Sequence, residues 1–303
     1  MTTVERAAPR WLIALVFGVL TLIWGTTWAA IRVSLVAIPP FTGVVLRFAL
    51  SGSLLLLAVP FLGLRLGRAR HERRLWLVNG LCTFGGSYGV VYWAEQWVPS
   101  GLASVLFATM PLFIALLAHL WLPEERLSAG RLVGILIGFA GVVLLFSEDF
   151  GRLASPEALG PAAIFLLSPL LSAIGAVATR KWGREVSPLS LASVPSLVGA
   201  AALAPLARLC EREWEPRTVP AGPWLALLYL AFAGTALTFT LYYWLIRRTS
   251  AQFAGLVGYS VPVVAVAVGA LWLGETVTLR VVAGGGLVLA GVAVALRARI
   301  GSA

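Results

Sequence analysis

The stretch TMPLFIALLAHLWLPEE, from Thr109 to Glu125, returns in altered form as SVPVVAVAVGALWLGET, from Ser260 to Thr276. Each copy has a proline near the start of an apolar run and ends in Leu-Trp-Leu, one further residue and a glutamate. A shift of 151 residues places Pro262 on Pro111 and Glu275 on Glu124, and a Gly-rich apolar segment follows each copy. The repetition predicts that the chain is built from two related halves.

The composition predicts that most of the chain lies in lipid. Of its 303 residues, 59% are hydrophobic and 12% are charged, and the mean hydropathy is +0.91. A soluble domain of this length could not bury so much apolar surface. The two cysteines, Cys82 and Cys210, support neither a disulfide framework nor a thiolate metal site. No metal and no cofactor is therefore expected.

Ten apolar runs of roughly 17 to 23 residues are each long enough to cross ~30 Å of hydrocarbon as a helix. They lie near residues 11–31, 41–62, 75–95, 101–122, 131–147, 160–180, 188–208, 224–245, 251–273 and 280–296. The first run is long and bulky and has no clear small-x-small cleavage site, so we expect a retained helix and not a signal peptide. The predicted fold is an all-α polytopic membrane protein with ten transmembrane helices.

The two halves are expected to be inverted with respect to each other. Because each half holds five helices, an odd number, the second half must enter the membrane from the opposite side. The predicted domains are a first five-helix repeat over residues 1–147 and a second, inverted repeat over residues 148–303, around a central cavity. Inverted repeats with a site between them are typical of secondary transporters that work by alternating access.

The basic residues predict the orientation. With the N-terminus inside, the cytoplasmic segments hold sixteen of them: Arg6, Arg10, Arg65, Arg68, Arg70, Arg73, Arg74, Arg126, Arg131, Arg180, Lys181, Arg184, Arg247, Arg248, Arg297 and Arg299. The other side holds six: Arg32, Arg152, Arg208, Arg212, Arg217 and Arg280. This bias predicts an inner-membrane protein with both termini in the cytoplasm. The net charge of +10 then indicates contact with anionic lipid and not with nucleic acid.

Several segments, taken in order, carry a resemblance to a known family. They are LIWGTTWAAIR at 22–32, LRFALSG at 46–52, PSGLASVLFATMPLF at 99–113 and the two LWL-x-E helix ends. Together they resemble the ten-helix EamA family of the drug/metabolite transporter superfamily, over essentially the whole chain. The resemblance implies export or exchange of small metabolites, often amino acids or nucleotide-related compounds.

The nearest branch within that resemblance is the aromatic amino-acid exporters. That branch places tryptophans in the cavity at the positions held here by Trp24, Met110 and Ser172. Only Trp24 matches, so the resemblance does not carry over a strictly aromatic substrate. The expected partners are a small-molecule substrate and the lipid bilayer, and the protein is expected to be a monomer.

Depth along each helix selects the candidate substrate-binding residues, because a site between inverted repeats lies near the midplane. Trp24 is thirteen residues beyond Trp11, about 20 Å along the axis, and so lies too deep to anchor at the interface. Thr235 is predicted at this depth but is not among the expected substrate-binding residues. Those are Trp24, Thr27, Tyr88, Met110, Ser168, Ser172, Thr238, Tyr242 and Tyr259. For each one the alternative is structural, since a midplane Ser or Thr often bonds its own helix and a lone aromatic ring often packs.

Few charged residues fall inside the predicted spans. Arg47 lies roughly 9 Å into the second helix, and Glu95, at the end of the third, is its expected partner. The pair is expected either to gate the mouth or bind a carboxylate, or to be purely structural. His119 is expected to pack or snorkel rather than to relay protons. Glu124 and Glu275 are expected to pair with Arg126 and Arg280, respectively, and to fix loops.

Pro111 and Pro262 each remove a helix hydrogen bond, which predicts bends at matching depths in two symmetry-related helices. The glycines at 85–89, Gly134 and Gly138, and those at 284–286 are expected to let helices approach closely. A channel, a membrane-embedded enzyme or a receptor remains an alternative to a transporter. An enzyme would need a nucleophile, base or metal cluster, and neither G-x-S-x-G nor H-E-x-x-H occurs.

Overall fold

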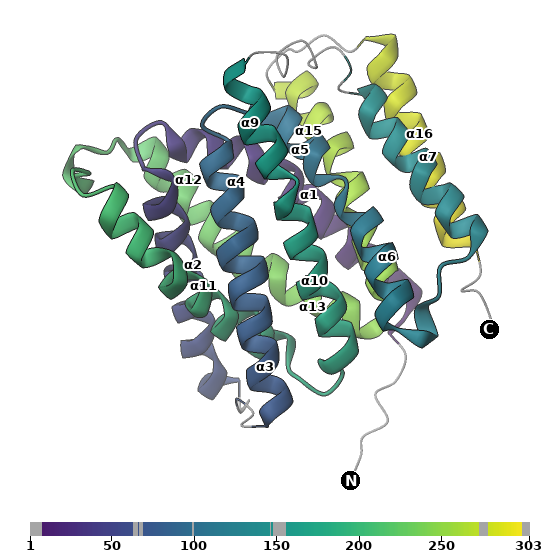
Figure 1. Cartoon of the computed structure of the whole chain (residues 1–303), viewed down its shortest axis with the longest axis horizontal. Helices are drawn as coiled ribbons and strands as arrows, with labels where there is room; N and C mark the ends of the chain where they lie inside the picture. Colours follow the sequence, from purple (N-terminus) through teal and green to yellow (C-terminus); the bar gives the residue numbers. More distant parts are fainter. Residues whose placement is uncertain are drawn as a thin grey trace.

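The structure is a computed structural model that describes residues 8–62, 66, 69–98, 100–145, 147, 156–272 and 278–298. Over these residues the chain is helical, and they contain no strand (Figure 1). In order, the elements are α1 (Arg10–Leu35), α2 (Pro40–Phe61), α3 (Arg70–Val78), η1 (Asn79–Ser87), α4 (Tyr88–Ala94), α5 (Ser100–Phe107), α6 (Met110–Trp121), η2 (Pro123–Glu125), α7 (Ala129–Leu145), α9 (Pro156–Phe165), α10 (Leu167–Trp182), α11 (Pro188–Cys210), η4 (Pro216–Thr218), α12 (Ala221–Ala231), η5 (Phe232–Leu237), α13 (Thr238–Arg248), α14 (Ala251–Gly255), α15 (Val257–Trp272) and α16 (Leu279–Arg297).

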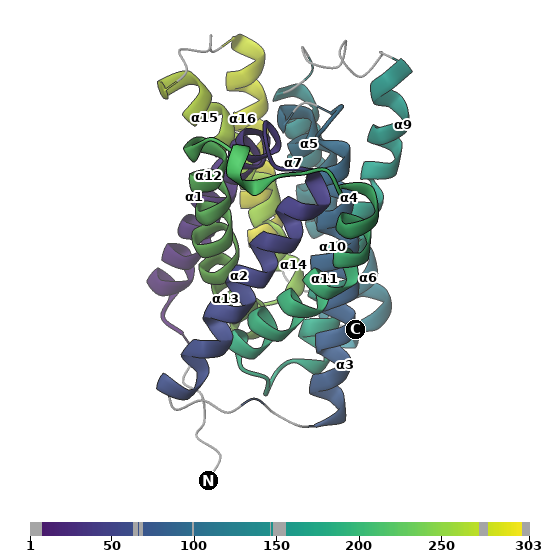
Figure 2. The ribbon, with the colours of Figure 1, turned by 90° about the vertical axis from the view of Figure 1, so that its left-hand side faces the viewer.

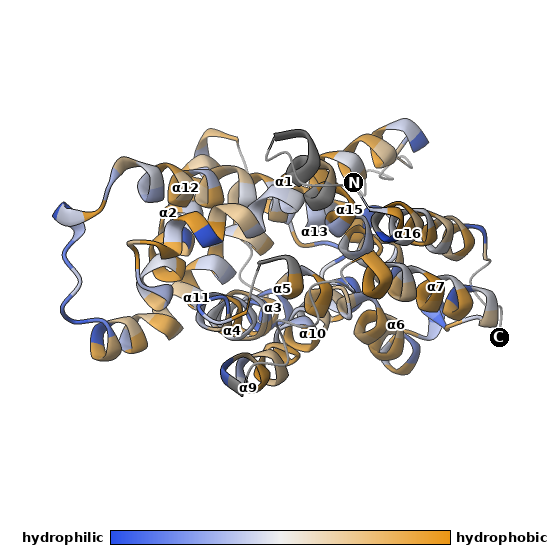
Figure 3. Cartoon of the chain, turned by 90° about the horizontal axis from the view of Figure 1, so that it is seen from above, coloured by the Kyte–Doolittle hydropathy of each residue, from blue (hydrophilic) through white to orange (hydrophobic). Residues whose placement is uncertain are grey.

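Consecutive segments continue one another, so the described helices group into ten rods, as the apolar runs predicted. Six helices in the described residues are long and apolar enough to cross a membrane, and three shorter apolar helices accompany them. Hydrophobic residues predominate along the helices (Figure 3). Some of the large ones face outward, because Leu22, Leu57 and Leu225 are 60%, 67% and 65% exposed. Large aliphatic groups so exposed are suited to lipid and not to water.

One end of the bundle is basic. Figure 1 shows the last turns of α6, α10, α13 and α16 at this end, together with the first turns of α1 and α3. The last turns of α10, α13 and α16 carry Arg180, Lys181, Arg247, Arg248 and Arg297. We call this the basic end of the bundle.

The helices pack as two interlocked halves. The second rod of each half meets its counterpart, α2 against α11, and the fifth rods meet as α7 and α16 (Figures 1 and 2). The contacts of α1 with α15 and of α10 with α6 are equivalent, because each joins the first rod of one half to the fourth rod of the other. Each third rod contains a π-helical segment, η1 in the first half and η5 in the second. The predicted boundary between residues 147 and 148 and the predicted Glu275 loop lie outside the described residues.

Glycines bring α7 and α16 together, as expected from the sequence. A Cβ atom on Gly284 would lie 2.6 Å from the backbone nitrogen of Leu145 and 2.8 Å from the carbonyl oxygen of Gly141. Such distances leave room for a hydrogen only, so the two backbones are in direct contact. Gly285 and Gly286 face open space instead, and no packing role is seen for them.

The two rods that contain Pro111 and Pro262 are both interrupted, but only one of them close to its proline. The rod with Pro111 is broken between α5 and α6 at Ala108–Thr109, where the missing amide hydrogen weakens the helix. The rod with Pro262 is broken at Leu256, between α14 and α15, while Pro262 itself lies inside α15. The predicted bend at Pro262 is therefore displaced toward the start of its rod. These two rods meet where a Cβ atom added to Gly258 would lie 3.6 Å from the ring of Pro111.

Candidate substrate cavity

A cavity of about 60 Å³ lies between the two halves. Its wall combines aromatic rings with a few hydroxyl and amide groups, and the described wall residues include no charged side chain. They are Trp24, Thr27, Trp28, Ile31, Asn79, Thr83, Tyr88, Val91, Phe107, Met110, Ser172, Ala176, Phe239, Tyr242, Tyr243, Ala254, Gly258 and Val261. This volume holds only a few water molecules, so the walls must separate before a metabolite can enter.

Trp24 joins the halves across the cavity. Its indole nitrogen donates a 3.0 Å hydrogen bond to the hydroxyl of Thr238, at the start of α13. Its ring lies at tilted and edge-on angles to Tyr242 and Phe239, with centroid distances of 5.1 and 5.6 Å. Because the hydrogen-bond acceptor and the ring partners of Trp24 all belong to the second half, any movement of α13 relative to α1 changes these contacts.

Polar groups of η1 form the opposite part of the wall. Asn79 donates to the hydroxyl of Thr179 at 3.0 Å and accepts from the hydroxyl of Tyr243 at 3.1 Å. The hydroxyl of Thr83 is buried and makes no hydrogen bond. Gly175 of α10 provides the space, since a Cβ atom there would collide with Thr83 and lie 2.7 Å from the Asn79 oxygen. An unpartnered buried hydroxyl facing a cavity is a group that a substrate can satisfy.

A serine cluster supports this wall from behind. The hydroxyl of Ser87 lies 2.8 Å from the hydroxyls of both Ser168 and Ser172, which stand one helical turn apart on α10. Ser172 reaches the cavity, whereas Ser168 is fully buried and stays behind the wall. The cluster fixes the position of Ser172 relative to the π segment.

Six of the nine residues predicted from depth line the cavity: Trp24, Thr27, Tyr88, Met110, Ser172 and Tyr242. The other three lie outside its wall. Ser168 is held by Ser87, and Thr238 is occupied by Trp24. Tyr259 is fully buried in a separate cluster, with its ring against Gly138 of α7. The depth argument places a residue along its helix but not around it, which explains these three differences.

Six polar or aromatic wall residues were not predicted from the sequence: Trp28, Asn79, Thr83, Phe107, Phe239 and Tyr243. Asn79 was not predicted to reach the cavity because the third span was expected to begin at residue 75. The helix begins at Arg70, about 7 Å further out, because its first turns are basic and amphipathic rather than apolar. Asn79 therefore lies deeper than hydropathy alone indicates. Trp28, four residues after Trp24, lies on the same helix face, and that spacing was the available signal.

Arg47 is fully buried and holds the halves together behind the cavity. Its guanidinium donates to the hydroxyl of Thr235 at 2.7 Å, to the carbonyl of Gly234 at 3.0 Å and to the hydroxyl of Tyr92 at 3.4 Å. It also lies 4.8 Å from the ring centroid of Tyr88, a wall residue. Neighbouring side chains commonly satisfy backbone groups where a membrane helix departs from α geometry. Arg47 does so for η5.

The predicted direct pair between Arg47 and Glu95 does not form. The donors of Arg47 are directed at η5 and Tyr92, and neither carboxylate oxygen of Glu95 makes a hydrogen bond. The physical reason is geometric, because Arg47 points across the bundle to the second half rather than along α4. Glu95 instead accepts through its backbone carbonyl from Arg32 of α1.

An ionic contact lies at the basic end of the bundle. Arg180, in the last turn of α10, lies 2.7 Å from a carboxylate oxygen of Glu125, and Glu125 is only 1% exposed. The same carboxylate accepts from the backbone nitrogens of Ala251 and Gln252 at 3.3 and 3.4 Å. Arg180 also donates to the carbonyl of Ile246, at 3.3 Å. We call Glu125, Arg180 and these backbone partners the latch.

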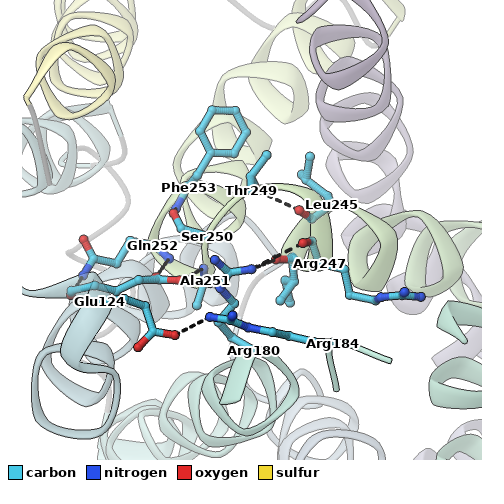
Figure 4. Close-up of polar contacts among 12 residues, drawn as sticks. Glu124, Arg180, Arg184, Leu245, Arg247, Thr249, Ser250, Ala251, Gln252 and Phe253 are labelled. Atoms are coloured by element: carbon cyan, nitrogen blue, oxygen red, sulfur yellow. Dashed lines mark hydrogen bonds and ion pairs between the residues drawn. The ribbon is translucent and has the colours of Figure 1, made fainter. Parts of the chain in front are cut away.

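Figure 4 shows weaker contacts around the latch. Glu124 lies 2.6 Å from Arg184, not beside Arg126 as expected, and both side chains are about half exposed. Arg131 donates to the side chain of Gln252 at 2.7 Å. His119, in the last turn of α6, is exposed and accepts from the backbone nitrogen of Leu127 in the following loop. A polar hollow of about 460 Å³, lined in part by Glu124, Glu125 and Arg180, lies at the same place.

The latch arginine has a counterpart at the other end of the bundle. Arg32 ends α1 as Arg180 ends α10, and these are the first rods of the two halves. Arg32 donates to the carbonyl of Glu95 after the third rod, whereas Arg180 donates to the carbonyl of Ile246 near the end of the eighth. Each arginine therefore binds the C-terminal end of the equivalent helix, where carbonyls carry partial negative charge.

Two inverted helical halves, a cavity between them and an ionic contact at one end form the architecture of a secondary transporter. The sequence profile described as the EamA-like transporter family matches residues 11–147 and again residues 160–297. The chain belongs to the EamA-like transporter family, and it is a multi-pass membrane protein.

Individual relatives agree with this assignment. The chain is 32% identical to the "uncharacterized inner membrane transporter YedA" of Escherichia coli (strain K12), a match covering 86% of this chain and 82% of that protein. It is 26% identical to the "uncharacterized transporter YoaV" of Bacillus subtilis (strain 168), over 90% and 92% of the two chains. A crystal structure that is 24% identical superposes with a TM-score of 0.79 over 95% of this chain and 97% of that one. That last likeness concerns the fold alone.

Proposed function

We propose that this transporter exports small metabolites across the inner membrane by alternating access, and that its main substrates are amino acids or related compounds. The observation that carries the proposal is the cavity wall between the halves, which is aromatic, uncharged in its described part and provided with amide and hydroxyl groups. Such a wall suits a zwitterion or heterocycle of modest size better than an ion. Trp24, Tyr88 and Tyr242 supply rings, whereas Asn79 and Thr83 supply polar contacts.

The latch supports the alternating-access part of the proposal. A buried ion pair holds the basic end shut, while the cavity above it is too small for a metabolite. Movement of the latch partners would open that end, and the matching arginine Arg32 lies at the other. A channel would need a continuous path, whereas a transporter needs two ends that close in turn.

The orientation follows from charge. Arg180, Arg247 and Arg297 lie at the basic end, and positive residues favour the cytoplasm. We therefore assign the basic end and both termini to the cytoplasmic side. The substrate and the bilayer are the partners that this arrangement needs, and a monomer suffices because the cavity is formed within one chain.

Counterflow in liposomes tests the proposal. Purified protein is reconstituted with an excess of one unlabelled amino acid, purine or cationic drug inside, and uptake of the labelled compound is followed. We expect transient accumulation of one or more amino acids, which a channel cannot produce. The matched control is the Trp11→Phe protein, altered at an exposed ring outside the cavity. Downhill equilibration without overshoot for every compound would contradict the proposal.

A further inference from the structure

Glu95 is a buried carboxyl group without a partner. It lies in the turn that follows α4, it is fully buried, and neither carboxylate oxygen makes a hydrogen bond. Buried carboxylates in proteins are normally paired or hydrogen-bonded, because an ionised group is otherwise strongly disfavoured away from water. The conformation described here therefore suits the neutral acid, which needs no counter-charge.

The charged neighbours of Glu95 favour its ionised carboxylate form. Arg32 of α1 and Arg47 of α2 are the charged groups that act on it, and Tyr92 of its own helix is the titratable neighbour. In the described part of the chain, no charged residue of α9 or α10, which also contact α4, acts on it. Both arginines direct their hydrogen bonds elsewhere, Arg32 to the backbone of Glu95 and Arg47 to η5. Movement of either arginine toward the carboxylate would create the missing ion pair.

Glu95 also lies one helical turn from the cavity wall. The backbone nitrogen of Glu95 is hydrogen-bonded to the carbonyl of Val91, one turn earlier, and Val91 lines the cavity together with Tyr88. Water that enters the cavity along this face of α4 comes within one helical turn of Glu95. Water from the opposite side reaches it when the end that holds Arg32 opens.

We propose that Glu95 is a proton-binding site that couples a proton to the transport cycle; this inference rests on the proposed alternating access. When the end opposite the latch is open, the carboxylate takes a proton from water there. The neutral acid is then buried as that end closes, as in the conformation described. When the latch opens, the proton passes from the carboxyl oxygen to water in the cavity, and the carboxylate is left beside Arg32 and Arg47.

Infrared spectroscopy of the protein in lipid tests the protonation. Neutral pH is far above the pKa of an exposed glutamate, which is about 4.3. Even so, we expect the C=O stretching band of a protonated carboxylic acid at that pH. The band should be absent in Glu95→Gln and present in Glu124→Gln, whose carboxyl group is half exposed. If Glu95→Gln does not fold, Glu95→Asp should shift the band in frequency instead. Absence of the band in the wild type, or its persistence unshifted in the Glu95 variants, would overturn the proposal.

Transport of a mixture of the twenty protein amino acids tests the coupling. In wild-type liposomes we expect accumulation driven by an imposed pH gradient as well as counterflow. Glu95→Gln should lose the gradient-driven accumulation and keep counterflow, because exchange of substrate needs no net movement of protons. Wild-type counterflow that ignores the pH gradient would refute the coupling alone, whereas absence of counterflow in the wild type would refute the proposed function.

Discussion

At the scale of single residues, neutral hydrogen-bond acceptors stabilise a fully buried arginine. Arg47 reaches a hydroxyl and a carbonyl of η5 and the hydroxyl of Tyr92, while its charge also lies near the ring of Tyr88. A buried cation is tolerated where each donor finds an acceptor. Arg47 therefore links the second rod of one half to the π segment of the other.

A double-mutant cycle tests this link. Arg47→Met and Thr235→Val should each lower the free energy of unfolding, and their coupling should be about 1.5 to 3 kcal/mol, the range for a hydrogen bond to a charged group. The same cycle with Arg47→Met and Glu95→Gln should be additive within about 0.5 kcal/mol, because the two side chains do not bond. Thermal unfolding in detergent gives the stabilities of the wild type, the three single variants and the two double variants. Strong coupling to Glu95 and none to Thr235 would contradict the geometry.

Trp24 gives a second prediction at this scale. Trp24→Phe keeps a ring but removes the donor to Thr238, so we expect slower counterflow with a loss of stability of about 1 kcal/mol or less. Trp11→Phe, at the exposed end of the same helix, should change neither. Both properties are measured on the same preparations. Transport at the wild-type rate in a folded Trp24→Phe protein would show that the indole donor is not needed.

The residue scale also shows what the sequence could and could not predict. Depth along a helix selected Trp24 and Tyr242 for the cavity, because axial position follows directly from residue count. The direction of a side chain around the helix depends on packing between helices, so Tyr259 was assigned to the cavity although it packs on α7. The partner of Arg47 was also wrong, because Thr235 lies in the other half of the chain and neutral acceptors carry no charge pattern.

At the scale of elements, close backbone contacts between small residues hold the rods together. The α7–α16 pair and the Gly175 contact with η1 both depend on a missing Cβ atom. The apolar runs predicted these helices, and the Gly-rich segments indicated that some would pack closely. The π segments η1 and η5 were not predicted, because one extra residue in a turn leaves the composition unchanged.

Two adjacent glycines of α16 offer a matched test of this packing. A methyl group at Gly284 would meet backbone atoms of Gly141 and Leu145, whereas one at Gly285 would meet nothing within 4 Å. We expect Gly284→Ala to lower the free energy of unfolding by about 1 to 3 kcal/mol. Gly285→Ala should be neutral or slightly stabilising, because alanine favours the helix. Equal effects on the melting temperature would contradict the direct backbone contact.

At the scale of the whole molecule, the two halves repeat one structural arrangement in opposite orientations. Arg180 and Arg32 bind the C-terminal ends of equivalent helices, but within the described residues only Arg180 has a carboxylate partner, Glu125. The repeated LWL-x-E stretches predicted this duplication, and the sequence placed Glu124 at a loop. It did not identify the latch, because Glu125 and Arg180 come from different halves and their pairing depends on how the halves pack.

The central claim is that the latch closes the cytoplasmic route to the cavity. It is tested by the rate at which a membrane-impermeant maleimide labels Ser172→Cys in right-side-out and inside-out vesicles, with Cys82 and Cys210 replaced by serine. Glu125→Gln should accelerate labelling from the cytoplasmic side by about tenfold for each 1.4 kcal/mol of lost latch stability, and a buried pair can lose on the order of 3 kcal/mol. Glu124→Gln, which breaks an exposed pair, should have little effect. Cytoplasmic labelling that is no faster in Glu125→Gln than in Glu124→Gln would contradict the account.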